Sequence, residues 1–137
     1  MKNITPYLAF DGDCRQAMEF YQRCLGGELS VMTFGDGDFG APPEARDRLV
    51  HASRSNGTTS LMASDTMPGM DYTAGNSVTL NLVLESVEEV DRMYEALGDG
   101  GKGTMAPHDS FWGSRFAMLT DRFGIHWMLN YDQSGER

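Results

Sequence analysis

Two segments of the chain carry apolar residues at the spacing of an amphipathic helix. In each segment the apolar positions recur at intervals of three and four residues, which places them on one side of an α-helix. The first stripe consists of Ala17, Phe20, Tyr21 and Cys24, and the second of Val90, Met93, Tyr94 and Leu97. The pattern predicts helices over about 14–25 and 87–97, each with one buried face.

The two predicted helices also begin alike, at the same offset of 73 residues that relates their stripes. Asp13 precedes the first helix, with Gln16 three positions later, and Ser86 and Glu89 repeat this arrangement before the second. Both pairs have the spacing of a capping box. A shared cap, stripe and tyrosine at one offset indicates an internal duplication of a unit of about 70 residues. We therefore expect two related modules that enclose one site between them.

Short apolar runs around the helices predict strands. The runs lie at 6–10, 28–34, 49–54, 58–63, 78–84, 115–120 and 125–131. Asn56-Gly57, between the third and fourth runs, is a strong signal for a hairpin turn. Segments 35–47 and 65–76 are rich in turn-forming residues, and we expect them to be long loops.

Each half of the chain therefore contains a strand, a helix and about three further strands. This order predicts the α+β class, with helices covering one side of largely antiparallel sheets. We expect one domain over 1–137, with one module at about 4–65 and the other at about 77–131. The glycine-rich segment 98–103 ends the second helix, and the residues after Asp132 form a polar tail.

Composition narrows the classes of function. The 137 residues carry a formal net charge of −9, from 11 Lys+Arg and 20 Asp+Glu. A surface this acidic repels phosphate backbones and anionic lipids, so we expect no nucleic-acid or membrane partner. No apolar run is long enough to span a bilayer, and the first ten residues lack the apolar stretch of a secretory signal. Cys14 and Cys24 are too far apart along one helix to bridge, which favours a cytoplasmic protein with reduced thiols.

Several motifs resemble a known superfamily. Duplicated βαβββ units with Phe20-Tyr21, Leu25-Gly26 and a late Asp121-x-x-Gly124 turn are similar to the vicinal oxygen chelate superfamily of glyoxalase, bleomycin-resistance and extradiol-dioxygenase proteins. The PhnB-like branch is the nearer likeness, through Pro6-Tyr7-Leu8, Glu19-Phe20-Tyr21, Ser64-Asp65, Met67-Pro68, Phe111-Trp112-Gly113 and Asp121-x-Phe123-Gly124-x-x-Trp127. The resemblance covers nearly the whole chain. It implies a curved sheet around a central cleft, and a homodimer.

That branch often bears a demethylubiquinone methyltransferase name. A methyl-donor site of the Rossmann type requires a glycine-rich loop that opens a helix. The sequence contains no such loop. We therefore expect no nucleotide-like methyl donor.

The resemblance also implies a divalent metal, held by His, Glu or Gln on the first, fourth, fifth and eighth strands. The eighth-strand ligand would stand four residues after the turn glycine, which is Met128 here. The first-strand position falls near Pro6 and its duplicate near Thr79, while the fourth strand offers Met62 and Ser64. None of these side chains suits a hard divalent ion. The sequence predicts that the metal site is lost and that no cofactor is required.

The three histidines do not have the spacing of a zinc site. His51 lies on the third predicted strand, His108 in a loop and His126 on the last strand. His126 is the best candidate ligand of the three, because alternation places it on one face with Met128 and Asn130. That face points into the cleft if the opposite face packs under the helices through Trp127, Leu129 and Tyr131.

Strand alternation then predicts which side chains contact a ligand. The candidates are His51, Met62, Ser64, Asp65, Asn81, Trp112, His126, Met128 and Asn130. Ten methionines suit an adaptable apolar site, although Met62 and Met128 could equally fill the space of a lost metal site. Trp112 either clamps a ligand from a mobile connection or anchors that connection. Asp65 is either an exposed turn residue or a general base in the site, where burial would raise its pKa.

Two functions remain open at this stage. The first is metal-independent binding of a small, partly apolar molecule. The second is glyoxalase-type catalysis with a metal held unconventionally around His51, Asp65 or His126. The missing ligands favour the first function. The identity of the small-molecule partner is not encoded, because a methionine-rich site specifies shape and polarity loosely.

Overall fold

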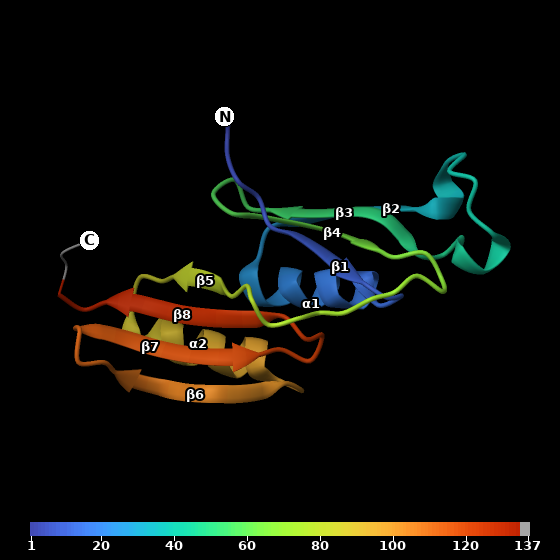
Figure 1. Cartoon of the computed structure of the whole chain (residues 1–137). Helices are drawn as coiled ribbons and strands as arrows, with labels where there is room; N and C mark the ends of the chain where they lie inside the picture. The colour runs from blue at the N-terminus through green and yellow to red at the C-terminus, as the bar shows by residue number, and fades with distance from the viewer. Residues whose placement is uncertain (135–137) are drawn as a thin grey trace. The chain divides into compact units, whose positions relative to one another are not determined.

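Each half of the chain folds as a strand, a helix and three further strands (Figure 1). The computed structural model describes residues 1–134. The chain divides into two compact units, Met1–Ala74 (unit 1) and Gly75–Arg137 (unit 2). In each unit one helix lies against one side of a four-stranded sheet, which confirms the α+β class and the duplicated βαβββ order.

The observed elements follow the predicted order closely. Unit 1 comprises β1 (Tyr7–Phe10), α1 (Cys14–Leu25), β2 (Glu28–Thr33), the short 3-10 turns η1 (Phe34–Asp36) and η2 (Pro43–Ala45), β3 (Leu49–Ser55) and β4 (Ser60–Asp65). Unit 2 comprises β5 (Leu80–Val83), α2 (Val87–Gly98), β6 (Lys102–Asp109), β7 (Ser114–Thr120) and β8 (His126–Asp132). The strand order is β1-β4-β3-β2 in one sheet and β5-β8-β7-β6 in the other. The first and last strands of each unit pair in parallel, and the other neighbours are antiparallel.

The helix-facing sides of the sheets form the two cores. In unit 1 the fully buried side chains include Phe10, Met18, Tyr21 and Leu49. In unit 2 they include Val90, Leu97, Leu119, Trp127 and Leu129. The burial of Trp127 and Leu129 confirms the predicted inner face of the last strand. Every large residue buried in this way contributes roughly 1.5–3 kcal/mol of transfer free energy, so these faces provide most of the stabilisation.

The late turn of the chain is fixed by one buried carboxylate. The Asp121 side chain accepts hydrogen bonds from the backbone N–H groups of Phe123 and Ile125, at 2.8 and 3.1 Å. Its second oxygen accepts from the indole N–H of Trp127, at 2.8 Å. Gly124 completes the turn with a positive φ of 89°, a conformation that favours glycine. The Asp121-x-x-Gly124-x-x-Trp127 motif therefore joins a turn to the core.

One strand is absent from the sequence-based prediction. β6 covers residues that the sequence suggested were a glycine-rich stop and a loop, including His108. Gly103 and Pro107 are unfavourable in strand interiors, and the first five residues of β6 are all exposed, so no alternation marks the strand. β6 forms because it is an edge strand that pairs with β7, with two register shifts.

The two helix starts are stabilised by different means. Ser86 caps α2 as predicted, since its side chain accepts from the backbone N–H of Glu89 at 3.0 Å. The predicted capping box at Asp13 is wrong, because the Asp13 side chain makes no cap hydrogen bond in the described part of the chain. The Asp65 carboxylate, at the end of β4, accepts from the N–H of Cys14 instead, at 3.0 Å. A tertiary contact thus replaces the local cap.

The residues that directly follow β8 are held by a hydrogen bond to the β6–β7 turn. The backbone N–H of Gln133 donates to the Gly113 carbonyl in the β6–β7 turn, at 2.9 Å. The remainder of the predicted polar tail, residues 135–137, lies outside the described residues. Within residues 1–134, neither helix is long and apolar enough to cross a membrane.

Candidate functional site

Cross-strand pairing in unit 2 builds a methionine-rich surface on the sheet face opposite α2. Residues that stand directly opposite each other on neighbouring strands share a face. One such set, here called the methionine row, crosses the four strands and consists of Met105, Met118, Met128 and Asn81. The adjacent set, the Phe116 row, consists of His108, Phe116, Asn130 and Val83. The predicted outward face of β8, with Met128 and Asn130, is therefore confirmed.

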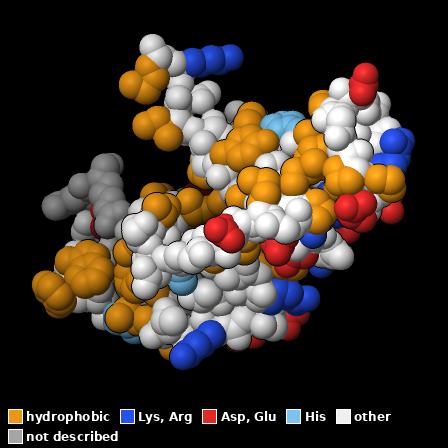
Figure 2. Space-filling view, turned by 45° about the vertical axis from the view of Figure 1, so that its right-hand side comes forward, with side chains coloured by type: hydrophobic (Ala, Val, Ile, Leu, Met, Phe, Trp, Pro, Cys, Tyr) orange, Lys and Arg blue, Asp and Glu red, His pale blue; other side chains and the backbone are white. Residues whose placement is uncertain are grey.

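Trp112 lies over the Phe116 row. Its ring centroid is 5.4 Å from that of Phe116 in a T-shaped arrangement, and the Phe111 ring also meets it edge to face, at 5.0 Å. Trp112 is 48% exposed and Phe111 98%. Figure 2 shows apolar side chains protruding at the edge of the molecule where the β6–β7 turn lies. Contacts between aromatic rings in this geometry add about 0.5–1.5 kcal/mol beyond their buried area.

The connection that carries Trp112 is a tight hairpin turn. The N–H of Ser110 donates to the Ser114 carbonyl at 2.7 Å, and the N–H of Gly113 donates to the Ser110 carbonyl at 3.2 Å. The Ser110 hydroxyl also accepts from the Ser114 N–H, at 3.0 Å. The expectation of a mobile glycine-rich connection before Trp112 is therefore wrong, since β6 and a hydrogen-bonded turn stand there.

Asn130 is the polar side chain buried within this surface. It is 7% exposed, and its Oδ1 atom has no hydrogen-bond partner among the described residues. Its cross-strand neighbours are Phe116 and Val83. A buried acceptor without a donor destabilises the fold by about 1–3 kcal/mol. Asn81, in the adjacent row, is exposed.

The two histidines of unit 2, His108 and His126, differ in how many of their ring nitrogens are engaged in the hydrogen bonds described. His126 has both ring nitrogens engaged: Nε2–H donates to the Gly75 carbonyl at 3.0 Å, and Nδ1 accepts from the Thr120 hydroxyl at 2.8 Å. These bonds leave no lone pair for a metal ion, so the preference for His126 as a ligand is wrong. His108 donates from Nδ1 to the Ala106 carbonyl at 2.9 Å, and its ring meets Phe116 edge to face.

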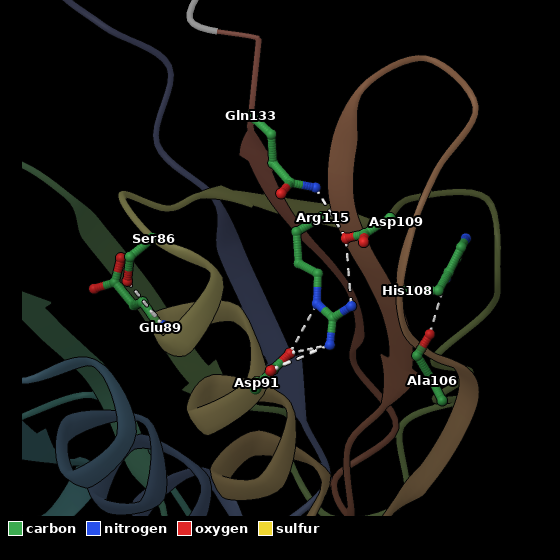
Figure 3. A network of polar contacts seen from close by, with 8 residues as sticks. All are labelled: Ser86, Glu89, Asp91, Ala106, His108, Asp109, Arg115 and Gln133. Atoms are coloured by element: carbon green, nitrogen blue, oxygen red, sulfur yellow. Dashed lines mark hydrogen bonds and ion pairs between the residues drawn. The ribbon is translucent and has the colours of Figure 1, made fainter.

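A polar network fixes the strands that carry this surface (Figure 3). Arg115 of β7 reaches Asp91 on α2, with an ion-pair distance of 3.0 Å, and Asp109 on β6, at 3.4 Å. The side-chain amide of Gln133 also donates to Asp109, at 2.9 Å. The network joins α2, β6, β7 and the end of β8, and so holds the hairpin beneath Trp112 in register.

The corresponding surface of unit 1 carries serines where unit 2 carries methionines. Its central row, on the face opposite α1, consists of Ser30, Ser53, Met62 and Tyr7. Alternation along β4 puts Ser64 on the same face as Met62, as predicted, with Leu61 and Ala63 buried behind. A hollow of about 640 Å³ lies over β2 and β3 near the Asn56-Gly57 turn, lined in part by Ser30, Ser53 and Ser55.

His51 joins the unit 1 surface through Tyr7. The Tyr7 hydroxyl and His51 Nδ1 are 3.0 Å apart, and the ring centroids lie 5.7 Å from each other. Met32 stands opposite His51 on β2. The predicted contacts His51, Met62 and Ser64 therefore lie on one face of this sheet, beside the serines that sequence reasoning overlooked.

Asp65 does not belong to this surface. It is 5% exposed, and its carboxylate accepts the backbone N–H groups of Gly12, Cys14 and Leu49 at 2.8, 3.0 and 2.9 Å. Alternation along β4 puts it on the helix side, opposite to Ser64. Both sequence-based expectations, an exposed turn residue and a general base in the site, are corrected: Asp65 holds the start of α1.

Burial also keeps the Cys14 thiol, next to Asp65, in its neutral form. The Cys14 side chain is fully buried, and this burial, together with the Asp65 and Asp13 charges, raises the pKa of the thiol to about 12. A helix N-terminus ordinarily lowers a thiol pKa. Here the Asp65 carboxylate occupies the place of the anion that the helix start would favour. Cys14 is therefore a neutral core residue at physiological pH.

The donor set does not fit the metal that the resemblance implies. Met62 and Met128 stand on the fourth and eighth strands, paired with Tyr7 and Asn81. Tyr7 pairs with Met62 as Asn81 pairs with Met128, so Tyr7 and Asn81 occupy corresponding positions. Pro6, which the sequence suggested, is one residue away, and a shift of one residue places a side chain on the other face of the sheet. Thioethers, a phenol and an amide are poor partners for a hard divalent ion. Within residues 1–134, no three His, Cys, Asp or Glu side chains are grouped to hold a metal.

The comparisons with known proteins agree with this fold. The family model of the Glyoxalase/Bleomycin resistance protein/Dioxygenase superfamily matches residues 3–129, and the chain belongs to that superfamily. Protein YjdN of Escherichia coli (strain K12) is 34% identical over 138 residues, covering 93% of each chain. The crystal structure of PA1353 from Pseudomonas aeruginosa superposes with a TM-score of 0.88 at 39% identity, covering 97% of this chain and 99% of that one.

A PhnB-type structure is also similar. The Bacillus cereus protein described as a putative 3-demethylubiquinone-9 3-methyltransferase, PhnB protein, gives a TM-score of 0.79 at 23% identity. It covers 95% of this chain and 99% of that one. At this identity the likeness shows the fold alone. The superfamily resemblance inferred from the motifs is confirmed by the family model, and a PhnB-type protein is among the structural neighbours.

The residues that the sequence predicted to contact a ligand thus fall into two groups, one on each sheet, with Asp65 as the exception. Unit 2 presents five on the face opposite α2: Asn81, Trp112, His126, Met128 and Asn130. Unit 1 presents His51, Met62 and Ser64 opposite α1, and Asp65 lies on the other side. Sequence reasoning missed Phe116, Met118 and Met105. Alternation along β7 could have identified Phe116 and Met118, whereas β6 shows no alternation that would have identified Met105.

Proposed function

We propose that this glyoxalase-fold protein binds a small, partly apolar molecule on the face of unit 2 opposite α2, without a metal ion. The observation that carries the proposal is the methionine row, where Met105, Met118 and Met128 stand side by side on three strands. Unbranched thioethers adapt to ligand shape and make favourable contacts with aromatic rings. Such a row next to a half-exposed tryptophan is suited to a flat apolar group.

The polar groups of the surface support binding over catalysis. His126 has both nitrogens engaged and Asp65 lies on the helix side of its own sheet, so neither is positioned as a base. Asn130 is a neutral amide, which orients a ligand through hydrogen bonds and cannot act as a nucleophile at neutral pH. Asn81, exposed on the edge strand β5, is likewise a neutral amide and no nucleophile. His108 is the one titratable side chain in the two rows, so the surface offers recognition without an acid–base pair.

Methionine methyl groups provide a direct test. Protein labelled with ¹³C at its ten methionine methyls is titrated with indole, a flat apolar bicycle, and followed by NMR. We expect saturable shifts of the Met105, Met118 and Met128 signals, while the buried Met18 and Met93 stay in place. Proportionate shifts of all exposed methyls, including that of Met70, or no saturable shift, would overturn the proposal.

A pair of variants matched for exposure sharpens this test. Trp112 and Phe39 are exposed to almost the same extent, 48% and 47%, and Phe39 belongs to the β2–β3 connection of unit 1. Trp112→Ala is expected to weaken indole binding about fivefold, because a ring contact contributes about 1 kcal/mol. Phe39→Ala is expected to leave the dissociation constant unchanged. Equal effects of the two variants would count against a site beneath Trp112.

The alternative function, a glyoxalase-type metalloenzyme, makes the opposite prediction for metals. A ligand that binds only the native state must raise its melting temperature. We expect EDTA, nickel, zinc and manganese to leave the melting temperature unchanged. A saturable, metal-specific rise would favour the enzyme. The homodimer and the cytoplasmic location stay predictions.

A further inference from the structure

We propose that Asn130 is the polar recognition point of this surface, and that the ligand carries an N–H or O–H donor at the edge of its flat apolar group. The inference rests on the proposed binding function and specifies the chemistry of the ligand. It starts from the juxtaposition of an unpaired amide oxygen with apolar and aromatic side chains on one sheet face.

The side-chain oxygen of Asn130 is buried and, within the described part of the chain, unpaired. Asn130 is more than nine-tenths buried, and its Oδ1 has no donor among residues 1–134. Buried polar groups in folded proteins nearly always have partners, so each exception calls for an explanation. Replacing Asn130 by an apolar residue of similar size would remove the penalty, which indicates that the amide is not explained by the stability of the fold.

The strand neighbours of Asn130 supply no donor from their side chains. Asn130 stands between Phe116 and Val83 in its row, and the next row on β8 is represented by Met128. Phe, Val and Met side chains offer no N–H or O–H group. A ligand donor that reaches Oδ1 would therefore form a hydrogen bond in an apolar environment, where such a bond is stronger than in water.

His108 adds a second acceptor to the same row. Its Nδ1–H is committed to the Ala106 carbonyl, so in the neutral ring Nε2 is an acceptor, and Figure 3 shows this nitrogen pointing away from the carbonyl. The chain also has a formal net charge of −9, which attracts electropositive groups. The row thus presents acceptors on both sides of the Phe116 ring, and the complementary ligand is a donor.

Access to Asn130 involves the aromatic turn. Because Oδ1 is shielded in the described conformation, a neighbouring side chain must move for a ligand to reach it. Trp112 is half-exposed and rests on Phe116, the cross-strand neighbour of Asn130. A flat group that enters between the rings of Trp112 and Phe116 lies beside Asn130. The same event stacks the apolar part and pairs the donor.

Two isosteric probes test the donor requirement. Indole and benzofuran have nearly the same shape, but only indole carries an N–H group. In the wild-type protein we expect indole to bind about fivefold more tightly than benzofuran, the effect of one net hydrogen bond. In Asn130→Leu we expect the ratio of the two dissociation constants to fall to about one.

Asn81→Leu is the matched control, because Asn81 is an exposed asparagine on the same face, in the adjacent row. This variant changes the affinity for both probes by the same factor and so keeps the preference for indole. Equal binding of indole and benzofuran to the wild type would overturn the inference while leaving the proposed function intact. Failure of both probes to bind would overturn the proposed function itself. Loss of the preference for indole in Asn81→Leu would show that Asn81, and not Asn130, recognises the donor, and the inference would be wrong.

A measurement without ligand tests the unpaired oxygen independently. Asn130→Leu is expected to raise the melting temperature of the free protein by about 4 °C, because it removes an unsatisfied acceptor. Asn81→Leu is expected to change it little, since exposed substitutions have small effects. A fall in the melting temperature of Asn130→Leu would show that the amide is satisfied in the free protein, and the inference would be wrong.

Discussion

The two units begin their helices by opposite strategies. The start of α1 is held by Asp65, which is 52 positions downstream of Asp13 and buried at the end of β4. The start of α2 is held by Ser86, its immediate neighbour, and the Glu89 carboxylate accepts the backbone N–H of Glu85 at 2.8 Å. Equivalent helices in one fold can therefore satisfy the same N–H groups through tertiary structure or through local sequence.

The sheet faces opposite the helices differ as well. Where unit 1 has Ser30 and Ser53, unit 2 has Met105 and Met118, at corresponding places in rows that both continue through a methionine of the last strand. The strand order is shared, whereas the side chains diverge and β6 pairs with β7 through two register shifts, where β2 and β3 have one. The duplicated fold therefore sets the positions on the sheet, while the residue types decide which unit presents an apolar surface.

The largest expected effect is at Asp65. Asp65→Ala leaves three backbone N–H groups, two of them buried, without their carboxylate acceptor, and we expect the free energy of unfolding to fall by about 3–5 kcal/mol. Urea denaturation followed by circular dichroism measures this change. A loss no larger than that of Ser86→Ala would show that the tertiary contact is no stronger than a local cap.

Exchanging residue types between the two rows has the next largest effect. Met105→Ser with Met118→Ser gives unit 2 the composition of unit 1 at these positions. We expect the free energy of unfolding to fall by roughly 1–2 kcal/mol, because both thioethers are only partly buried. Indole affinity should fall about tenfold in the NMR titration, since two contacts are lost. Retained affinity would place the binding surface outside the methionine row.

The local cap of α2 comes third. Ser86→Ala removes the acceptor of the Glu89 N–H, and we expect a loss of about 1 kcal/mol in the free energy of unfolding. Asp13→Ala is the matched substitution at the other helix, and it should change stability by less than about 0.5 kcal/mol. Equal losses in the two variants would mean that Asp13 caps α1 in solution.

The smallest effect concerns the reactivity of Cys14. Its folded-state pKa of about 12 lies above the ordinary thiol pKa of 9.0, so stabilisation by the neutral thiol is complete below about pH 9 and is lost as the pH rises toward 12. We expect iodoacetamide at pH 8 to label Cys24 well before Cys14 in the native protein. Asp65→Asn should speed labelling of Cys14. Rapid labelling of Cys14 in the wild type would contradict its assignment as a neutral core thiol.

Patterns that depend on near neighbours were readable in the sequence. The apolar stripes located α1 at its observed bounds and α2 to within one residue, and the Asn56-Gly57 signal marked the β3–β4 turn. Alternation along β8 correctly separated Met128 from the buried Trp127. These features follow from backbone periodicity and turn chemistry, which act within a few residues and leave their mark in the local pattern.

Features that depend on distant partners were decided by tertiary structure. β6 is a strand because β7 lies beside it, although Gly103 and Pro107 argue against a strand. Asp65 is buried because three N–H groups from separate segments converge on it, and nothing in its local sequence distinguishes this from an exposed turn. The unpaired Asn130 oxygen is visible only once every neighbour is placed, because the absence of a hydrogen-bond partner belongs to the packed environment and has no sequence pattern of its own.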